Sequence, residues 1–470
     1  MSRLKMTFMI ASLCLCGCAN FSGIHSESKP ASIAATKFSV DSKWWTIFKD
    51  DQLDALIGEA LADSPDINIA QARIRLAKGQ AALSDAALSP RIDANGSAVR
   101  QKISSKGYFP PPLGGSTLNL GQLTLDFDYE FDWWGKNHAA LNAALSEAKT
   151  SEAEAAETRL ILGTAIARSY FRLEADLAKL EILKHIRDRQ EALLRLVRLR
   201  AQNGIESDFR VRQGESTVAG AKLDILKTED AIAQGRSRIA ALLGKPPERG
   251  DAITGRVAPP PPIPTSIAAD LIGMRPDILA QRSRIEAASS RVDIAKAEFY
   301  PNIDLAAYVG VQSIGFGNLV KGGSEIASIG PAIHLPIFGG GRLRSNLGMK
   351  YAEYDIAVEQ YNKMVIDAMR DVSQAGVALK SIVNEISEQN KVTDGLLEAH
   401  KIALLRYRAG LGDELSVLET ETPLLSQRNV KTELDELRLE AVTTMIQSLG
   451  GVPTLESAPT QGSAPNSNPG

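Results

Sequence analysis

The chain contains two copies of one pattern, and this internal repeat constrains its fold more than any other feature. Three matches recur at a roughly constant offset: SPDI at 64–67 with RPDI at 275–278, PRID at 90–93 with PNID at 301–304, and LG at 243–244 with LG at 449–450. The matches run from residue 64 to residue 244 in the first copy, and a repeat of this length is a whole structural unit rather than a short motif. The 470 residues are therefore interpreted as a tandem duplication, so a fold proposed for one half must also serve the other.

Each half predicts the same order of elements: a helix, two strands, a very long helix and a helix that runs back. Residues 113–245 and 337–422 contain no proline, which breaks helix interiors. Strong helix formers, mainly alanine, leucine, glutamate and arginine, fill the stretches 136–203 and 342–409. A helix of that length spans on the order of 100 Å. Each half is thus expected to build a long antiparallel helical hairpin.

These patterns predict a division of the chain into six parts. They are 1–17, a lipoprotein signal peptide; 18–62, a lipidated N-terminus and equatorial segment; 63–245, the first repeat, with strands at about 91–134 and a hairpin at 136–243; 246–275, an equatorial linker; 276–449, the second repeat, with strands at about 302–338 and a hairpin at 342–449; and 450–470, an equatorial segment and disordered tail.

The strongest strand signal is residues 123–133, LTLDFDYEFDW, where apolar and polar side chains alternate strictly. The polar face carries four acids in succession, namely Asp126, Asp128, Glu130 and Asp132. We expect these acids to face a water-filled lumen, and the aromatic end of the segment to lie at a membrane interface. A half-buried strand of a soluble protein alternates in the same way and is the alternative. Weaker strands are predicted at 91–100, 303–314 and 326–337.

Four strands in one chain have a consequence for assembly. No stretch after residue 18 has the ~18–20 apolar residues of a membrane helix, so a membrane-spanning part must be built from strands. An open sheet edge in lipid leaves backbone groups unpaired, and the smallest bacterial barrels have about eight strands. Three chains would supply twelve strands in a cyclic trimer. The helices alone do not exclude a soluble coiled-coil rod.

All three cysteines lie at positions 14, 16 and 18. A zinc or disulfide interpretation lacks partner cysteines elsewhere. Two basic residues precede the uncharged run 6–15, as in a secretory signal. The sequence Leu-Cys-Gly-Cys that ends this run resembles a bacterial lipobox, which implies that Cys18 becomes the lipidated first residue of the mature chain. Ala19 after it implies an outer membrane destination by similarity to lipoprotein sorting rules. An ordinary signal peptide cleaved nearby is the alternative.

Several spaced motifs carry a resemblance to a known family. They are WWxxFxDDxLxxLIxxAL at 44–61 followed by SPD, then RPDI at 275–278, AKAEFYP at 295–301 and RYRAG at 406–410. Together they resemble TolC-like outer membrane factors, and most closely the NodT-type lipoproteins of resistance-nodulation-division (RND) efflux systems. The resemblance covers nearly the whole mature chain. It implies an α+β membrane protein that closes as a trimer into a 12-stranded β-barrel and a periplasmic α-barrel, with an equatorial belt.

The resemblance also implies a function. The chain would be the outer membrane exit duct of a tripartite efflux system in a Gram-negative bacterium. It would passively export drugs or other small compounds that an inner-membrane RND pump delivers through a periplasmic adaptor protein. An outer membrane factor for type I protein secretion and a structural coiled-coil lipoprotein are the alternatives.

A duct needs a gate, which we expect where the hairpins converge, at the turns 203–208 and 409–414. The candidate residues are Asp208, Asp413 and Glu414 as an acidic ring, with Arg406 and Arg408 as its latch. In the family the aperture acid directly follows a glycine and an apolar residue; here Gly412 occupies that position and Asp413 follows it. Solvated turn charges, worth under about 1 kcal/mol each, are the alternative. Pro423 is either a functional kink or a tolerated break.

The composition predicts no enzyme, cofactor or metal site. The net charge of −3 without a basic block gives no footprint for nucleic acid. The five histidines are scattered, and His334 alternates with apolar residues in a predicted strand. The run Gly339-Gly340-Gly341-Arg342 lacks the Gly-Lys-Ser/Thr ending of a phosphate loop, and glycine there suits a strand that turns into a helix.

Overall fold

The computed structural model describes residues 21–32, 38–41, 43–255 and 269–455. The predicted signal peptide, Cys18 and the tail from residue 456 lie outside these residues, as does much of the predicted linker. Within the described residues, none of the helices combines the length and the apolar character needed to cross a membrane.

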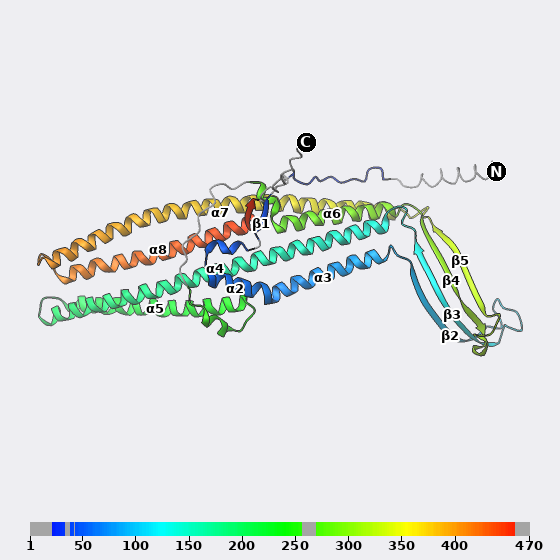
Figure 1. The fold of residues 1–470 in the computed structure, drawn as a ribbon, viewed down its shortest axis with the longest axis horizontal. Helices are drawn as coiled ribbons and strands as arrows, with labels where there is room; N and C mark the ends of the chain where they lie inside the picture. The colour runs from blue at the N-terminus through cyan, green and yellow to red at the C-terminus, as the bar shows by residue number, and fades with distance from the viewer. Residues whose placement is uncertain (1–20, 33–37, 42, 256–268, 456–470) are drawn as a thin grey trace, which may run out of the picture. The chain divides into compact units, whose positions relative to one another are not determined.

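The two repeats have the predicted order of elements (Figure 1). The first consists of α3 (Pro65–Ala86), β2 (Arg91–Lys102), β3 (Thr117–Glu130), α4 (Lys136–Gln202) and α5 (Asp208–Leu242). The second consists of α6 (Pro276–Ala297), β4 (Asn302–Ile314), β5 (Glu325–His334), α7 (Arg342–Arg408) and α8 (Glu414–Leu449). This confirms four strands and two long helical hairpins in one chain.

Shorter elements lie before, between and after the repeats. They are β1 (Phe38–Asp41), η1 (Trp44–Phe48), α2 (Asp51–Asp63), η2 (Pro247–Ala252), η3 (Ala269–Met274), η4 (Phe316–Asn318) and β6 (Val452–Leu455). The strands β1 and β6 pair antiparallel, with Phe38 opposite Leu455 and Asp41 opposite Val452. The segments expected to form an equatorial belt at the two ends of the sequence are thus joined by backbone hydrogen bonds.

The compact units of the chain do not coincide with the sequence repeats. One unit comprises residues 1–30, 73–152 and 280–362, and the other comprises 31–72, 153–279 and 363–470. Each unit therefore draws on both repeats, and the helices α3, α4, α6 and α7 contribute residues to both units. Duplication produced the sequence pattern, whereas packing joins equivalent parts of the two copies.

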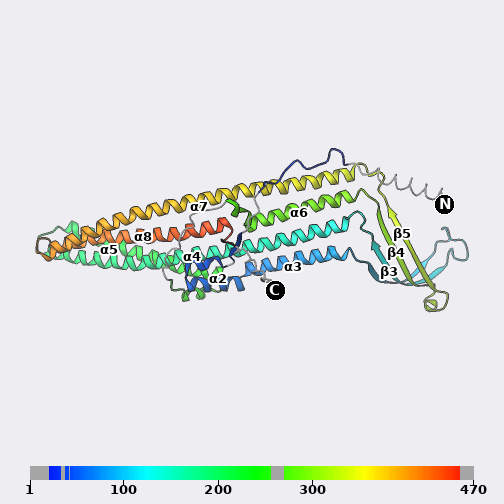
Figure 2. The ribbon, with the colours of Figure 1, turned by 45° about the horizontal axis from the view of Figure 1, so that its top comes forward.

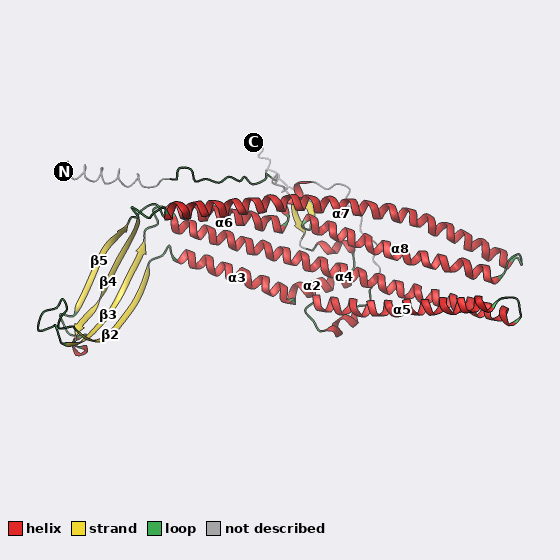
Figure 3. Ribbon diagram, turned by 180° about the vertical axis from the view of Figure 1, so that it is seen from behind, coloured by secondary structure: helices red, strands yellow, loops and turns green. Residues whose placement is uncertain are grey.

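The first unit contains the four-stranded sheet, in the order β2-β3-β4-β5 with antiparallel neighbours throughout (Figure 3). The register places Asp126 opposite Asp93 on β2 and opposite Tyr308 on β4, so these three side chains share one face. On the other face of β3, Leu123 and Leu125 are each 53% exposed. The outer strands β2 and β5 have one paired edge each within the chain.

The bounds of the strands differ from the predicted ones mainly in β3. It begins at Thr117, before the alternating stretch, and ends at Glu130, three residues before that stretch does. Phe131 extends the ladder by one hydrogen bond, from its N–H to the carbonyl of Ile303. The chain then turns into α4, so the alternation of residue types continues beyond the strand itself.

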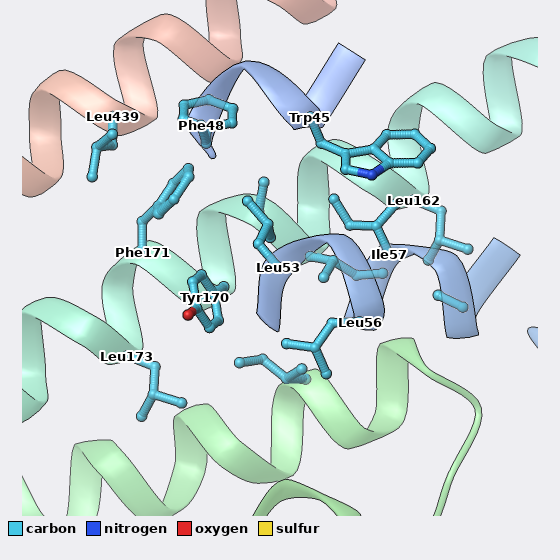
Figure 4. Close-up of a cluster of buried hydrophobic side chains, with 14 of the residues drawn as sticks. Trp45, Phe48, Leu53, Leu56, Ile57, Leu162, Tyr170, Phe171, Leu173 and Leu439 are labelled. Atoms are coloured by element: carbon cyan, nitrogen blue, oxygen red, sulfur yellow. The ribbon is translucent and has the colours of Figure 1, made fainter. Parts of the chain in front are cut away.

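The second unit contains the largest apolar cluster, around α2 and α4 (Figure 4). Leu53, Leu56 and Ile57, spaced three and one residues apart, form the apolar face of α2 and are at most 2% exposed. Asp50 begins this helix, because its carboxylate accepts hydrogen bonds from the N–H groups of Gln52 and Leu53, each at 2.9 Å. The buried Tyr170 hydroxyl donates to the same carboxylate at 3.0 Å.

The helices of both hairpins end in the same way. Gly204, Gly244, Gly410 and Gly450 follow α4, α5, α7 and α8, and all four have φ between +69° and +82°. At each, the N–H of the glycine and that of the next residue return to carbonyls of the last helical turn, for example Ile205 to Arg200 at 2.9 Å. This is the Schellman motif, in which glycine adopts the left-handed conformation without strain.

Candidate functional site

The hairpin tips bring residues of both repeats together. Asp413 precedes α8 and caps it, since its Oδ1 accepts from the N–H of Ser416 at 3.1 Å and from the Ser416 hydroxyl at 2.7 Å. Its other oxygen, Oδ2, lies 3.2 Å from Nη2 of Arg200 in the last turn of α4. One acid therefore both starts the returning helix of the second hairpin and holds the first hairpin.

The electrostatics agree with this double role. The Ser416 hydroxyl and N–H, followed by the Arg200 guanidinium, lower the pKa of Asp413 below its usual value. The carboxylate is therefore ionised at neutral pH and remains so in mild acid. Because both side chains are accessible to water, the ion pair is open to screening by salt.

The other predicted gate residues lie at the same tips and are all exposed, namely Asp208, Arg406, Arg408 and Glu414. Asp208 and Glu414 stand in the first turns of α5 and α8, where an acid complements the helix dipole. Nη2 of Arg406 is 3.5 Å from the carbonyl oxygen of Leu411. Among the described residues neither Arg406 nor Arg408 has an acidic partner within its own chain, so the predicted latch by these arginines stays a prediction.

Arg200, the cation that binds Asp413, is not among the gate residues predicted from the sequence. Arg200 and Asp413 are 213 positions apart, and no local pattern links them. The duplication supplies the one available signal: α4 and α7 begin at residues 136 and 342, a difference of 206, and 406 minus 206 is 200. Arg200 is thus the first-repeat counterpart of Arg406, which the sequence did single out.

The tip contact is the last of a series along α4 and α8, which lie side by side (Figures 1 and 2). In each pair α4 supplies the cation, and α8 or its N-cap residue supplies the acid. The pairs are Arg172 with Glu436 at 3.5 Å, Lys179 with Glu433 at 2.8 Å, Arg189 with Glu421 at 3.0 Å and Arg200 with Asp413 at 3.2 Å. The two hairpins are therefore held together within one chain by opposite charges as well as by apolar contacts. We call this contact the α4–α8 seam.

The polar face of the sheet carries three of the four predicted acids. The Asp126 carboxylate accepts hydrogen bonds from the Asn95 amide at 2.6 Å and the Thr124 hydroxyl at 3.0 Å. Asp128 lies 3.7 Å from Arg91, and Nζ of Lys136 lies 2.6 Å from Glu130. These acids follow one another at alternate positions on one strand, so they share a face as the sequence predicted.

The fourth acid, Asp132, is a correction. It lies beyond the end of β3, and its carboxylate accepts from the N–H groups of Asn137 at 2.9 Å and His138 at 2.8 Å. Burial alone would raise the pKa of Asp132, but these donors and the His138 ring outweigh burial and lower that pKa. Asp132 therefore organises the start of α4 and is not a member of the strand face, because unpaired N–H groups at a helix start attract a nearby carboxylate.

A segment near the N-terminus is bound along α7. In residues 21–30, the N-terminal strap, the Ser26 hydroxyl donates to Asp355 at 2.6 Å, and the N–H groups of Glu27 and Ser28 donate to the same carboxylate at 3.2 Å each. Phe21 packs edge-on against Phe299, with ring centroids 5.0 Å apart. Although burial opposes it, the strap's donors lower the pKa of Asp355.

Similarity to known proteins supports one family. The family model described as "Outer membrane efflux protein" matches residues 56–245 and 268–451, one match in each repeat. The chain is 34% identical to the fusaric acid resistance protein FusA of Burkholderia cepacia over 371 residues, 73% of this chain and 68% of the relative. It is 28% identical to the multidrug resistance outer membrane protein MdtP of Escherichia coli K12, covering 96% of this chain and 97% of the relative.

Solved structures give the same result for the fold. The outer membrane protein VceC of Vibrio cholerae superposes with a TM-score of 0.79 at 34% identity, covering 88% of this chain and 99% of that one. The CmeC outer membrane channel of Campylobacter jejuni superposes with a TM-score of 0.83 at 21% identity, covering 93% and 96%. With both repeats matched, the chain belongs to the outer membrane efflux protein family, the TolC-like channels through which compounds leave Gram-negative bacteria.

Proposed function

We propose that the chain forms, as a homotrimer, the exit duct of a tripartite efflux system. An inner-membrane pump of the RND class would deliver drugs or other small compounds through a periplasmic adaptor, and the duct would pass them across the outer membrane. The duct itself needs no nucleophile or cofactor, because energy enters at the pump. Relatives named for multidrug and fusaric acid resistance support small compounds as the cargo.

The sheet carries this proposal. Its four strands have one free edge on β2 and one on β5, and unpaired edges are costly in lipid. One chain cannot close the sheet, whereas three chains bring β5 of each beside β2 of the next and give twelve strands. Leu123 and Leu125 would then face lipid, and Asp126 and Asp128 would face the water-filled interior.

The gate is proposed at the hairpin tips. Within one protomer, the first hairpin holds the second through Arg200 and Asp413. In a closed ring each second hairpin must also meet the first hairpin of the next protomer. There Arg406, the counterpart of Arg200, would reach the acids beside Ser207, the counterpart of Asp413, and Asp208 is one of these. Arg406 and Arg408 would thus latch neighbouring protomers, while Asp208, Asp413 and Glu414 line the mouth.

The lipid anchor at Cys18 is the second membrane attachment in this proposal. The strap runs parallel to α7: Arg344 binds the carbonyl of Ser22 at 2.8 Å, and Asn362 binds that of Lys29 at 3.1 Å. Ser22 therefore lies beside the first turn of α7, close to where β5 ends, and Cys18 is only four residues away. This short separation in sequence supports the proposal that an acyl chain on Cys18 reaches the membrane at this end of the first unit.

Deletion of the gene tests the proposed function. In the deletion strain, a panel of fluorescent dyes and antibiotics should accumulate above wild-type levels, and complementation with the wild-type gene should reverse this. In parallel, outer membrane fractions should contain a heat-modifiable trimer on denaturing gels. Unchanged accumulation across the panel, or a protein that remains monomeric in the outer membrane, would contradict the proposal.

A further inference from the structure

The two repeats share a close contact at the root of each hairpin. Gly244, which follows α5, lies against Pro65 at the start of α3, and a Cβ atom on this glycine would be 2.6 Å from the proline Cδ. Gly450, which follows α8, lies against the start of α6, where a Cβ atom would be 2.9 Å from the Arg275 Cα. In both repeats the returning helix thus ends on the helix that leads to the strands.

The first root combines apolar packing with ion pairs. The helix α2 leads directly into Pro65, and its face of Leu53, Leu56 and Ile57 is buried in the main core beside α4. Ser64, the residue before the proline, is only 2% exposed. Two ion pairs, Lys245 with Asp63 at 3.1 Å and Arg249 with Glu59 at 2.7 Å, add contacts between α2 and the segment after α5.

The second root differs in the residue before its proline, because the charged Arg275 takes the place of Ser64. Its Nε and Nη2 bind the two Asp277 oxygens at 3.1 and 2.7 Å, at the start of α6. Its Nη1 donates to the carbonyl of Ser448, at the end of α8, at 3.1 Å, and lies 3.6 Å from Asp371 on α7. One guanidinium, with a side chain 13% exposed, therefore joins three helices.

The contact of Arg275 with Asp371 on α7 has no counterpart in the first repeat. With the offset of 206 between α4 and α7, residue 371 corresponds to residue 165, which is alanine. Asp277 and the Ser448 carbonyl would suffice to cap the ends of α6 and α8. Capping does not require the contact with Asp371. That contact instead fixes the angle between α7 and the other two helices.

We propose that Arg275 is a positioning residue for gating, which fixes the root angle of the second hairpin and thereby holds its tip against the first. This rests on the proposed function as a gated duct. From Asp371 to the end of α7 at Arg408 is 37 residues by number, or about 55 Å of helix. Over a lever of that length, a rotation of about 1° at the root moves the tip by about 1 Å. Loss of the Arg275 contacts should therefore displace the tip of the second hairpin.

Two variants and one control test this in planar bilayers. Arg275→Ala removes all its contacts with the three helices. Asp371→Asn weakens the contact with α7, together with the pair that Asp371 forms with its neighbour Arg370 at 2.9 Å, and leaves the caps of α6 and α8 in place. The control is Arg249→Ala, because Arg249 binds Glu59 in the same two-pronged way, at 3.3 and 2.7 Å, and both partners belong to segments outside the second hairpin. We expect Arg275→Ala to raise the open probability about threefold or more, because each Arg275 ion pair is weak but the trimer loses these pairs in all three protomers. Asp371→Asn should give a smaller rise and Arg249→Ala none.

A lock at the tip separates gating from general loosening. After Cys18 the sequence contains no cysteine, so Arg200→Cys with Asp413→Cys provides a unique pair that a bifunctional thiol reagent can bridge. In the Arg275→Ala background, bridging should return the open probability to the wild-type value. Three results would overturn the proposal. They are a wild-type open probability in both Arg275→Ala and Asp371→Asn, an equal rise in open probability in Arg249→Ala, and a rise in Arg275→Ala that persists after bridging. A wild-type protein that forms no channel would instead contradict the proposed duct.

Discussion

The four helix-ending glycines allow one prediction to be worked out in detail, because they share a motif and differ in their surroundings. At Gly204 and Gly410, on the hairpin tips, a Cβ atom would meet no heavy atom within 4 Å. At Gly244 and Gly450, on the hairpin roots, it would meet atoms at 2.6 and 2.9 Å. Glycine to alanine at each position therefore imposes the same backbone strain, with a steric overlap added only at the roots.

The magnitudes follow from these two costs. A non-glycine residue in the left-handed conformation costs about 1–2 kcal/mol, which is the whole cost expected at the tips. Overpacking against a neighbour that cannot move aside adds about 1–3 kcal/mol. The proline ring beside Gly244 and the Arg275 backbone beside Gly450 are such neighbours. The root substitutions should thus lower the free energy of unfolding by about 2–5 kcal/mol.

The assay is unfolding of the detergent-solubilised protein in guanidinium chloride, followed by the helical circular dichroism signal. The free-energy differences come from the shift in midpoint at constant slope. The expected ranking is the same in both repeats: Gly244→Ala costs more than Gly204→Ala, and Gly450→Ala costs more than Gly410→Ala. Equal losses at roots and tips would refute the reasoning, since steric contact is the one difference between the members of each pair.

Three further predictions concern the tips, the strap and the lipid anchor. Arg200→Ala should raise single-channel open probability, because it frees the second hairpin tip, whereas Arg198→Ala, which breaks a 2.8 Å pair with an acid of the same hairpin, should not. Because the pKa of Asp355 is lowered in the folded protein, its carboxylate stabilises the bound strap fully above about pH 4, the usual pKa of an aspartate in an unfolded chain. This stabilisation is lost as the pH falls further, through the lowered pKa. Amide hydrogen exchange of the strap at several pH values should show the loss, and Asp355→Asn should abolish this pH dependence. Labelled palmitate should be incorporated by the wild type and by Cys16→Ser but not by Cys18→Ser.

The repeated architecture was predictable because its determinants are local. Proline-free stretches of strong helix formers end at glycines, and these signals depend on neighbouring residues alone. The structure accordingly ends α4 at Gln202 and α7 at Arg408, next to the predicted ends. The assembly of the two compact units from both repeats was not predictable in this way, because it depends on packing between segments far apart in the sequence.

Two residues of the candidate sites show what local sequence patterns do not predict. Asp132 continues the alternation of β3 perfectly, but the unpaired N–H groups of Asn137 and His138 bind its carboxylate and draw it out of the strand. A period-two pattern does not reveal such competition. For Arg200 the duplication gives only its equivalence to Arg406; neither spacing nor composition indicates that it contacts Asp413 in the other hairpin.

The differences between the repeats, rather than their similarity, indicate where function lies. The caps and turns are duplicated, yet the residue that begins the returning helix is Ser207 without a side-chain cap in the first hairpin and Asp413 with a cap and an ion pair in the second. The residue before the root proline is buried Ser64 in the first repeat and the charged clamp Arg275 in the second. At both ends, the second hairpin has one charged residue, Asp413 or Arg275, whose counterpart in the first is a serine, and that residue bridges to a neighbouring helix. The first root has ion pairs of another kind, between α2 and the segment after α5. Charged contacts are the ones that a docking partner with its own charges can exchange at little cost, because the lost ion pair is replaced by another. The second hairpin is therefore the element that we expect to move when a partner opens the duct, with the first as its fixed support.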